Sequence, residues 1–262
     1  MALLEVHGLG KHFASAQRQG EAPWIIRNLS FALDEGEFVT LLGPSGAGKS
    51  TILNMIGQVE APSEGRISLR GESVFDITRP SLRPGLGRQI GYVTQDDNLL
   101  PWRTLLDNVL FGLEIQGPIA ATDRARAREM MEMVGLSGFE HYYPHELSGG
   151  MRKRAALIRT LVYEPPIILM DEPFGALDAE TRAQLQSDLQ RLWDLNHQTI
   201  VFVTHDIAEA IALGDRVLIL KRAPSSVIGE HRVELARPRI VDDILTDSRF
   251  VALYEAIRAQ VR

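Results

Sequence analysis

The stretch that decides the fold of this chain is Gly43-Pro44-Ser45-Gly46-Ala47-Gly48-Lys49-Ser50-Thr51. It fits the pattern G-x-x-x-x-G-K-[ST] at every fixed position. The glycines keep side chains out of the way, so that successive backbone N–H groups can point into one concavity and hold phosphate oxygens. The pattern therefore predicts a nucleotide-binding loop.

The residues around this loop support that prediction. Residues 37–42 form a strand-like run before it, and residues 50–58 have the pattern of a helix after it. The helix offers its positive end to the anion, Lys49 would reach the β- and γ-phosphates, and the Ser50 hydroxyl would ligate Mg²⁺. Kinases, GTPases and transport motors all use such a loop, so the rest of the chain must decide the class.

Composition limits the classes of protein to consider. The 262 residues are 45% hydrophobic, which suits one large domain or a domain with a subdomain. With 28 Lys and Arg against 34 Asp and Glu, the net charge is −6, so we expect no nucleic-acid partner, although a local basic patch is compatible with it. Cysteine is absent, which excludes disulfides, zinc-thiolate sites and thiol nucleophiles.

Targeting signals are not evident. Residues 1–7 lack the basic and apolar regions of a signal peptide. The chain also has no run of about 18 uninterrupted apolar residues of the kind that spans a membrane. We therefore expect a cytoplasmic protein whose membrane role, if it has one, comes through a partner.

The remaining chain shows strand and helix patterns in the order of an α/β fold. An excursion at residues 14–23 separates strand-like residues 3–6 and 31–42, and residues 96–163 read as helices. One of these helices has an apolar face formed by Ala127, Met130, Met131 and Val134, with Arg124, Arg126 and Arg128 on its solvated side. The other expected strands cover residues 65–71, 89–95, 167–172, 199–204, 216–220 and 227–235, and the other expected helices cover 179–195, 207–213 and the C-terminal residues.

A second group of polar and glycine motifs follows the helical region. Leu147-Ser148-Gly149-Gly150-Met151 precedes a helix pattern, which taken alone indicates only a cap or a turn. The apolar strand at 167–172 then ends in Asp171-Glu172. After it come Gly175-Ala176-Leu177-Asp178 and Val203-Thr204-His205-Asp206.

In this order the motifs resemble those of the nucleotide-binding subunits of ATP-binding cassette (ABC) transporters, over about residues 3–222. The resemblance implies a P-loop NTPase fold, with a core of mostly parallel sheet flanked by helices. It also implies an N-terminal antiparallel β subdomain and an inserted α-helical subdomain. The single ABC ATPase domain, 1–262, would comprise a core with the β subdomain at 1–95 and 164–222, a helical signature subdomain at 96–163, and a short C-terminal strand and helix at 223–262.

The resemblance further implies an ATP site shared between two copies of the chain. Residues 43–51, the Walker A loop, would bind Mg-ATP, and the signature of the second copy would close the site. Ser148 and the N–H groups of Gly149 and Gly150 would then cap the γ-phosphate from outside. A monomer should bind ATP but hydrolyse it poorly.

Within each site the resemblance assigns four more residues. Asp171 would hold Mg²⁺ mainly through water, and Glu172 would orient and deprotonate the attacking water. His205 would contact the γ-phosphate and stabilise the charge that develops there. Gln95 would touch Mg²⁺ or the water when the subunits close.

Two assignments at the edge of the site leave alternatives, and one signature residue receives no assignment. Asp178 would bridge the two subunits, and it can also be the N-cap of the helix that follows. Phe13 matches the aromatic residue that stacks on adenine, with Trp24 as its rival. Met151 replaces the usual signature glutamine, and we assign it no role.

The segment from Gln95 to Thr104 looks like that of importer ATPases for nitrate, sulfonates and taurine, as do residues 143–152 and 173–182. The implied partners are an integral-membrane permease and, indirectly, an extracytoplasmic solute-binding protein, with this chain on the cytoplasmic side of the cell membrane. Leu99, Leu100 and Trp102 would anchor the permease, unless Trp102 is subdomain core. The alternatives are the ATPase of an exporter or lipid-transport system, and a soluble ABC ATPase acting in DNA repair or on the ribosome.

Overall fold

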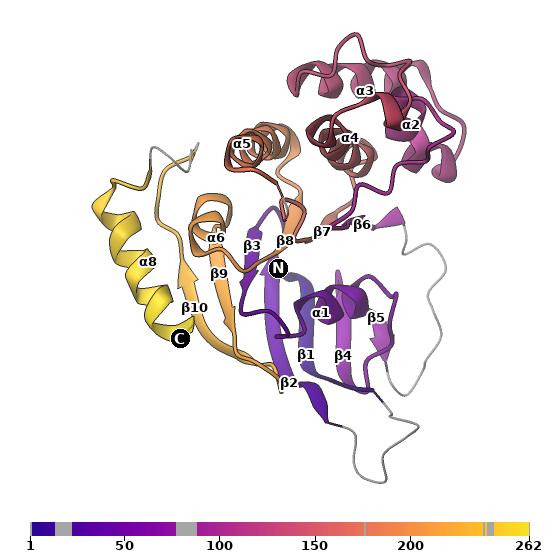
Figure 1. Ribbon diagram of the computed structural model, residues 1–262. Coiled ribbons are helices and arrows are strands. Elements are labelled where there is room, and N and C mark those ends of the chain that lie inside the picture. The colour runs from indigo at the N-terminus through magenta and orange to yellow at the C-terminus, as the bar shows by residue number, and fades with distance from the viewer. Residues whose placement is uncertain are drawn as a thin grey trace. The chain divides into compact units, whose positions relative to one another are not determined.

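The computed structural model describes residues 2–13, 23–76, 88–175, 177–237, 239 and 244–261. The chain divides into two compact units, which we describe separately. Unit 1 comprises Met1–Gly87 and Thr199–Arg262, and unit 2 comprises Arg88–Gln198. Figure 1 labels their helices and strands.

An antiparallel sheet forms the N-terminal part of unit 1 (Figure 1). Its strand order is β2-β1-β4-β5, with bounds β1 Ala2–His12, β2 Trp24–Asp34, β4 Glu64–Leu69 and β5 Glu72–Asp76. Leu4 and Leu9 of β1 are fully buried, as expected for a strand with one face on the core. The predicted antiparallel β subdomain is therefore confirmed.

Unit 1 also contains a mostly parallel set of strands in the order β10-β9-β3-β8. The bounds are β3 Phe38–Leu42, β8 Thr199–Thr204, β9 Arg216–Leu220 and β10 Val227–Arg232. Strand β3 runs parallel to both β8 and β9, and β10 pairs with β9 antiparallel at the edge. Every residue of β3 and β8 is buried, which explains why these strands are continuous apolar runs with a few Thr residues.

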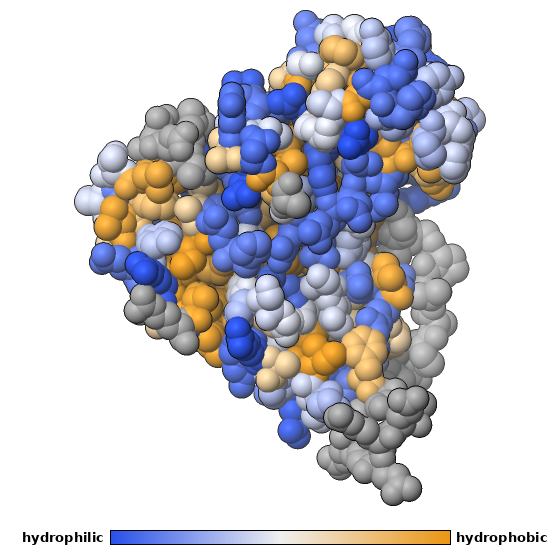
Figure 2. Space-filling model, viewed as in Figure 1, coloured by the Kyte–Doolittle hydropathy of each residue, from blue (hydrophilic) through white to orange (hydrophobic). Residues whose placement is uncertain are grey.

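Three helices accompany these strands in unit 1: α1 Lys49–Ile56, α6 Ile207–Leu213 and α8 Ser248–Val261. Helix α8 packs beside α6, β9 and β10 (Figure 1). Its Phe250 and Ile257 enter a buried cluster with Ile211, Val217 and Ile219. Hydrophobic residues remain visible along the surface near α8 (Figure 2).

Unit 2 holds two parallel strands and most of the helices. The strands are β6 Ile90–Val93 and β7 Ile167–Asp171, and the helices are α2 Leu105–Gln116, α3 Ala121–Met133, α4 Gly149–Leu161, α5 Ala179–Asn196 and the 3-10 turn η2 Pro144–Glu146. The expected apolar face of α3 is buried at Ala127, Met130, Met131 and Val134. Over α2 and α3 the visible surface is predominantly hydrophilic (Figure 2), as expected for a solvated outer side.

Several element bounds differ from the sequence prediction. Strand β1 extends to His12 rather than stopping near residue 6, and β10 ends at Arg232 rather than 235. The predicted excursion at 14–23 lies outside the described residues except for Pro23. The proposed subdomain boundaries at residues 95 and 163 stay a prediction.

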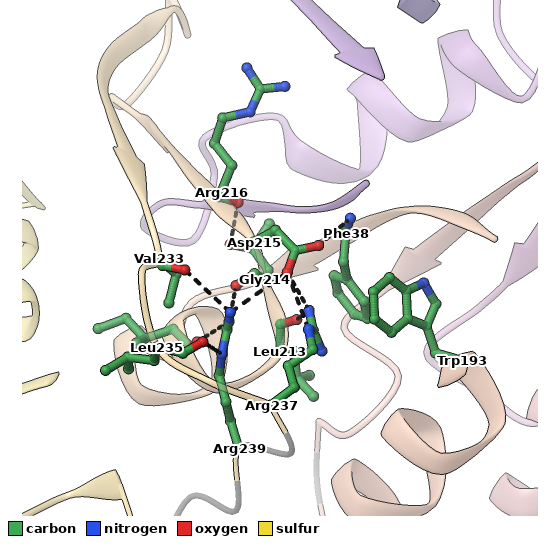
Figure 3. A network of polar contacts seen from close by, with 12 residues as sticks. Phe38, Trp193, Leu213, Gly214, Asp215, Arg216, Val233, Leu235, Arg237 and Arg239 are labelled. Atoms are coloured by element: carbon green, nitrogen blue, oxygen red, sulfur yellow. Dashed lines mark hydrogen bonds and ion pairs between the residues drawn. The ribbon is translucent and has the colours of Figure 1, made fainter. Parts of the chain in front are cut away.

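A buried arginine holds the end of helix α6 in unit 1 (Figure 3). Arg239 is 3% exposed, and its guanidinium donates to the backbone carbonyls of Leu235 (2.9 Å), Val233 (3.2 Å), Ile211 (3.3 Å) and Gly214. Burial and the nearby charge of Arg237 lower the pKa of Arg239 to about 10, so it stays charged at neutral pH. Asp215 lies 3.6 Å from it and also accepts from Arg237 at 2.7 Å.

Removing the Arg239 side chain should therefore destabilise unit 1. We expect Arg239→Met to lower the free energy of unfolding by about 3 kcal/mol, because several buried carbonyls lose their donor. The matched control is Arg249→Met, since the side chain of Arg249 is 66% exposed and pairs only with Asp247 among the described contacts. It should change the free energy by less than about 0.5 kcal/mol. Urea denaturation measures both, and equal losses would contradict this account of Arg239.

Candidate ATP-binding site

The predicted phosphate loop connects β3 to α1 in unit 1. Helix α1 begins at Lys49, after Gly48 in the left-handed region with φ 74°. A Cβ atom at Gly48 would also lie 3.0 Å from Cγ2 of Ile25. At Gly43 a Cβ atom would lie 2.9 Å from the carbonyl oxygen of Leu220. The backbone path of the loop thus requires glycine at both ends of the x-x-x-x stretch.

Lys49 lies against the loop that precedes it. The residue is 5% exposed, and its Nζ donates to the carbonyl oxygens of Gly43 (2.7 Å) and Pro44 (3.2 Å). Within the described helix α1, the first turn has no acidic residue and no side-chain cap. Ser50 is exposed there. The helix start and the ammonium group therefore place positive charge at the loop, which suits an anion.

Both candidates for the adenine-stacking residue lie in unit 1. Phe13 is 45% exposed, and Nζ of Lys11 lies 4.8 Å from its ring centroid. The ring of Trp24 meets the ring of His12 edge-on at 4.8 Å, and Arg27 lies over it at 5.6 Å. The Phe13 ring is thus the more accessible of the two, because Trp24 is only partly exposed.

His205 follows the buried end of β8. Thr204 is 2% exposed, and its hydroxyl donates to Glu209 and accepts from the backbone N–H of Asp206 at 3.0 Å. Asp206 in turn caps α6 by accepting from Ala208 N at 2.8 Å. These contacts fix the turn and leave the His205 side chain at the surface of unit 1.

The predicted acidic pair ends strand β7 in unit 2. Asp171 is the last residue of the strand, and Glu172 has a left-handed backbone with φ 43°. Non-glycine residues in this conformation carry strain of about 1–3 kcal/mol and cluster at functional sites. Burial, and then the negative charge of Asp171, raise the pKa of the Tyr92 hydroxyl.

Gln95 lies beside the turn that Glu172 begins. Gly175 closes this turn with a hydrogen bond from its N–H to the Glu172 carbonyl at 3.0 Å. A Cβ atom at Gly175 would lie 3.3 Å from Nε2 of Gln95. Unit 2 therefore brings Gln95 close to the turn at Glu172, although these two predicted site residues are far apart in the sequence.

The Ser-Gly-Gly motif forms the start of helix α4. Ser148 is its N-cap, and the Ser148 hydroxyl accepts from the backbone N–H of Met151 at 3.3 Å. Ser148 and Gly149 are exposed, and Gly150 is half-buried against Thr181, whose Cγ2 would lie 3.2 Å from a Cβ there. The described first turn has no acidic residue, so this helix start can also accept an anion.

Asp178 is the N-cap of α5, as the sequence allowed. Its carboxylate accepts from the backbone N–H of Thr181 at 2.9 Å. The backbone and side-chain hydrogen bonds of Thr181 lower the pKa of Asp178. Ala176, in the same motif, lies outside the described residues.

The three proposed permease anchors differ in how exposed their side chains are. Trp102 is 72% exposed, so the interpretation of it as subdomain core is wrong. Leu99 is only 8% exposed and belongs to the core instead, and Leu100 is half-buried. A pocket of about 330 Å³ lies in the same region of unit 2, lined by Arg103, Asp107, Leu110, Glu114, Ile119 and Arg124 among others.

The donor atoms at the predicted magnesium position fit a hard cation. The candidates are the Ser50 hydroxyl, the Gln95 amide oxygen and the Asp171 carboxylate, and Mg²⁺ prefers such oxygens together with phosphate oxygens and water. Among the described residues, no group of three or more His, Cys, Asp and Glu could hold a metal ion.

A family model described as ABC transporter matches residues 26–175. The chain belongs to the ABC transporter family. Its similarity to an uncharacterized ABC transporter ATP-binding protein of Methanocaldococcus jannaschii is 43% identity over 237 residues, which are 90% of this chain and 84% of that protein. The taurine import ATP-binding protein of Pseudomonas syringae is 38% identical over 265 residues, 100% of this chain and 96% of that protein.

A solved structure agrees with these relatives. It is a dimeric ATP-binding cassette in a post-hydrolysis state, bound to ADP and Pi. It matches with a TM-score of 0.73 and 33% identity, over 89% of this chain and 100% of that chain. The predicted ABC fold and the ATPase class are therefore confirmed. No helix among the described residues has the length and apolarity needed to span a membrane.

Sequence reasoning missed a set of contacts inside this ABC cassette. Arg152, Lys153 and Arg159 of α4 bind the loop that begins at Gln95. The run Arg152-Lys153-Arg154 after the signature is visible in the sequence as a cluster of charge. Nothing in the spacing of this run identifies its acceptors, which are the backbone carbonyls of Leu147 and Gln95 and the carboxylates of Asp97 and Asp188.

Proposed function

We propose that this chain is the ATP-hydrolysing subunit of an ABC importer for a small solute such as nitrate, a sulfonate or taurine. A separate permease would carry the solute. The observation that carries the proposal is the match to a taurine import ATP-binding protein over the whole chain. The exposed Trp102, in the segment typical of these importers, supports it.

The Walker A loop, residues 43–51, would hold the phosphates of ATP. Lys49 would exchange its two backbone carbonyl partners for the β- and γ-phosphate oxygens, which are stronger acceptors. Phe13 would stack on adenine. Ser50, Asp171 and Gln95 would hold Mg²⁺, which neutralises charge on the β- and γ-phosphate oxygens when bound.

Glu172 would act as the general base. Its carboxylate would take a proton from water as the water oxygen attacks the γ-phosphorus and the bond to the ADP oxygen breaks. Glu172 has a left-handed backbone, a strained conformation that often occurs at functional sites, and this supports a catalytic role for the residue. His205 would stabilise the charge on the γ-phosphate oxygens, and Gln95 would orient the water or Mg²⁺ from the neighbouring loop.

A second copy of the chain would complete each site. Ser148, Gly149 and Gly150 present donors at an exposed helix start, where they can reach only an anion offered from outside. Asp178 would bridge the two copies. The dimeric form of the similar cassette supports this arrangement.

The permease would dock on unit 2 around Trp102. An exposed aromatic residue is the kind of anchor that dominates protein interfaces. Docking would hold the chain at the cytoplasmic side of the cell membrane, with an extracytoplasmic solute-binding protein acting on the other side of the permease.

The core would comprise residues 1–95 and 164–222, and the helical subdomain 96–163.

Glu172→Gln should abolish ATP hydrolysis, lowering the rate at least about 100-fold, because the amide cannot accept the proton from water. ATP affinity should stay within about twofold, and ATP should trap the variant as a dimer. Lys49→Ala, in contrast, should lower ATP affinity itself. Steady-state phosphate release and calorimetry measure these effects, and near-native turnover by Glu172→Gln would show that another residue is the base.

Ser148→Arg should also reduce hydrolysis at least about 100-fold, because a bulky side chain replaces a donor at the γ-phosphate. ATP affinity of the monomer should not change, since the Walker A loop is in unit 1. The control is Ser137→Arg, at another exposed serine of unit 2, which should keep full activity. A Ser148→Arg monomer that hydrolyses ATP at the native rate would refute the shared site.

Purification of the tagged chain from native membranes tests the transport role. We expect a permease to co-purify, and its operon to encode a solute-binding protein. Trp102→Ala should weaken this association at least about tenfold, because a central aromatic anchor is worth 2 kcal/mol or more. Val59→Ala, at an equally exposed position in unit 1, should not. A DNA or ribosome partner in place of a permease would contradict the proposal, and an exporter-type permease would favour the alternative.

A further inference from the structure

Three cationic side chains of helix α4 bind one short loop in unit 2. Lys153 donates to the carbonyl oxygen of Gln95. Arg159 donates to the carbonyl oxygens of Asp97 (2.8 Å) and Asn98 (2.6 Å). We call residues 95–98 the clamped loop, since its carbonyls are held by the helix that starts at the signature.

Arg152 makes the one contact of this set that reaches the signature itself. Its Nε donates to Oδ2 of Asp97 at 3.0 Å, and its Nη1 donates to the carbonyl oxygen of Leu147 at 2.7 Å. Leu147 directly precedes Ser148, the N-cap of α4. One planar guanidinium therefore ties the clamped loop to the residue next to the Ser148 hydroxyl.

Asp97 is held from its other side as well. Its Oδ1 accepts from the backbone N–H of Leu99 at 3.2 Å. The Asp97 and Arg152 side chains are 26% and 35% exposed, so water screens the pair only in part. The carboxylate thus connects Arg152 to the backbone that leads toward Trp102.

The next part of that backbone is fixed by a buried amide. Asn108 of α2 is 0% exposed, accepts from Leu100 N at 2.7 Å, and donates to the carbonyl oxygens of Leu100, Arg103 and Thr104 at 3.0–3.1 Å. Trp102 lies inside this fixed segment. A displacement of the Trp102 backbone should therefore be felt at both ends of the segment, because the Asn108 amide binds Leu100 on one side and Arg103 and Thr104 on the other.

A pocket of about 570 Å³ lies beside these contacts. Its lining includes Gln95, Asp97, Gly149, Arg152 and Lys153, so it touches both the clamped loop and the start of α4. Apolar packing does not fill this space. The polar contacts of α4 border this space, and Arg152 supplies the one next to the signature.

We propose that Arg152 is a positioning residue that links the clamped loop to the signature, so that the segment carrying Trp102 and the Ser148 hydroxyl move as one body. The proposal rests on the proposed function, in which Ser148 closes the ATP site of a second copy. Arg152 touches no reacting atom. It sets the position from which Ser148 meets the γ-phosphate.

The test uses the full chain with the Glu172→Gln substitution, so that ATP closes the dimer without turnover. Asp97→Asn removes the charge that holds Arg152 while it keeps an oxygen for Leu99. We expect it to raise the dimer dissociation constant in saturating Mg-ATP about tenfold, the scale of a lost charge-assisted hydrogen bond. ATP affinity of the monomer and the melting temperature should change little. Sedimentation measures the dimer, and calorimetry at low protein concentration measures ATP binding.

Two matched variants separate positioning from general destabilisation. Asp97→Glu keeps the carboxylate and should stay within about threefold of the parent. Asp96→Asn removes an exposed neighbouring acid that lines the same pocket, and it should leave the dimer constant unchanged. Arg152→Lys should behave like Asp97→Asn, because the single ammonium nitrogen lacks the two separate, coplanar donors with which the guanidinium reaches Asp97 through Nε and Leu147 through Nη1.

Equal dimer constants for Asp97→Asn and Asp96→Asn would overturn the proposal, and so would a loss that follows the melting temperature. Failure of the shared site gives a different result. In that case the Glu172→Gln parent itself would not dimerise with Mg-ATP. This result would refute the proposed role of Ser148 as well as that of Arg152.

Discussion

The structure depends on a narrow turn that leads from a buried strand into a helix. Strand β3 is enclosed between β8 and β9, so its end is fixed in place, and the chain must enter α1 after only six residues. Side chains at Gly43 or Gly48 would collide with Leu220 or Ile25. Glycine is therefore needed at both ends of the turn, and the ammonium group of Lys49 lies against it. This positive charge and the start of α1 together suit a phosphate group.

The same chain presents a second helix start of similar chemistry, and this one is exposed. Helix α4 begins at Ser148 without an acidic residue in its described first turn. The helix start in unit 2 would serve the phosphates bound at the loop of a second copy in the proposed cycle, which explains why two copies are needed there. The polar contacts of Arg152 and Asn108 would then give the open site a mechanical connection to Trp102.

Motifs with fixed backbone chemistry were predictable from the sequence. The glycine turn between β3 and α1, the buried strands β7 and β8 and the Asp178 cap follow from glycine spacing, continuous apolar runs and a polar residue before a helix. The extent of β1 and β2 did not follow, because register shifts interrupt their pairing and blur the alternation. The exposure of Trp102 and the partners of Arg152 depend on tertiary neighbours, which local patterns do not encode.

The central claim is that two copies of this chain share each ATP site. The most direct measurement is the rate of ATP hydrolysis per chain as a function of protein concentration at saturating Mg-ATP. A shared site predicts that this specific rate rises with concentration and levels off once the dimer dominates. A specific rate that stays constant down to concentrations at which sedimentation shows only monomer would contradict the account.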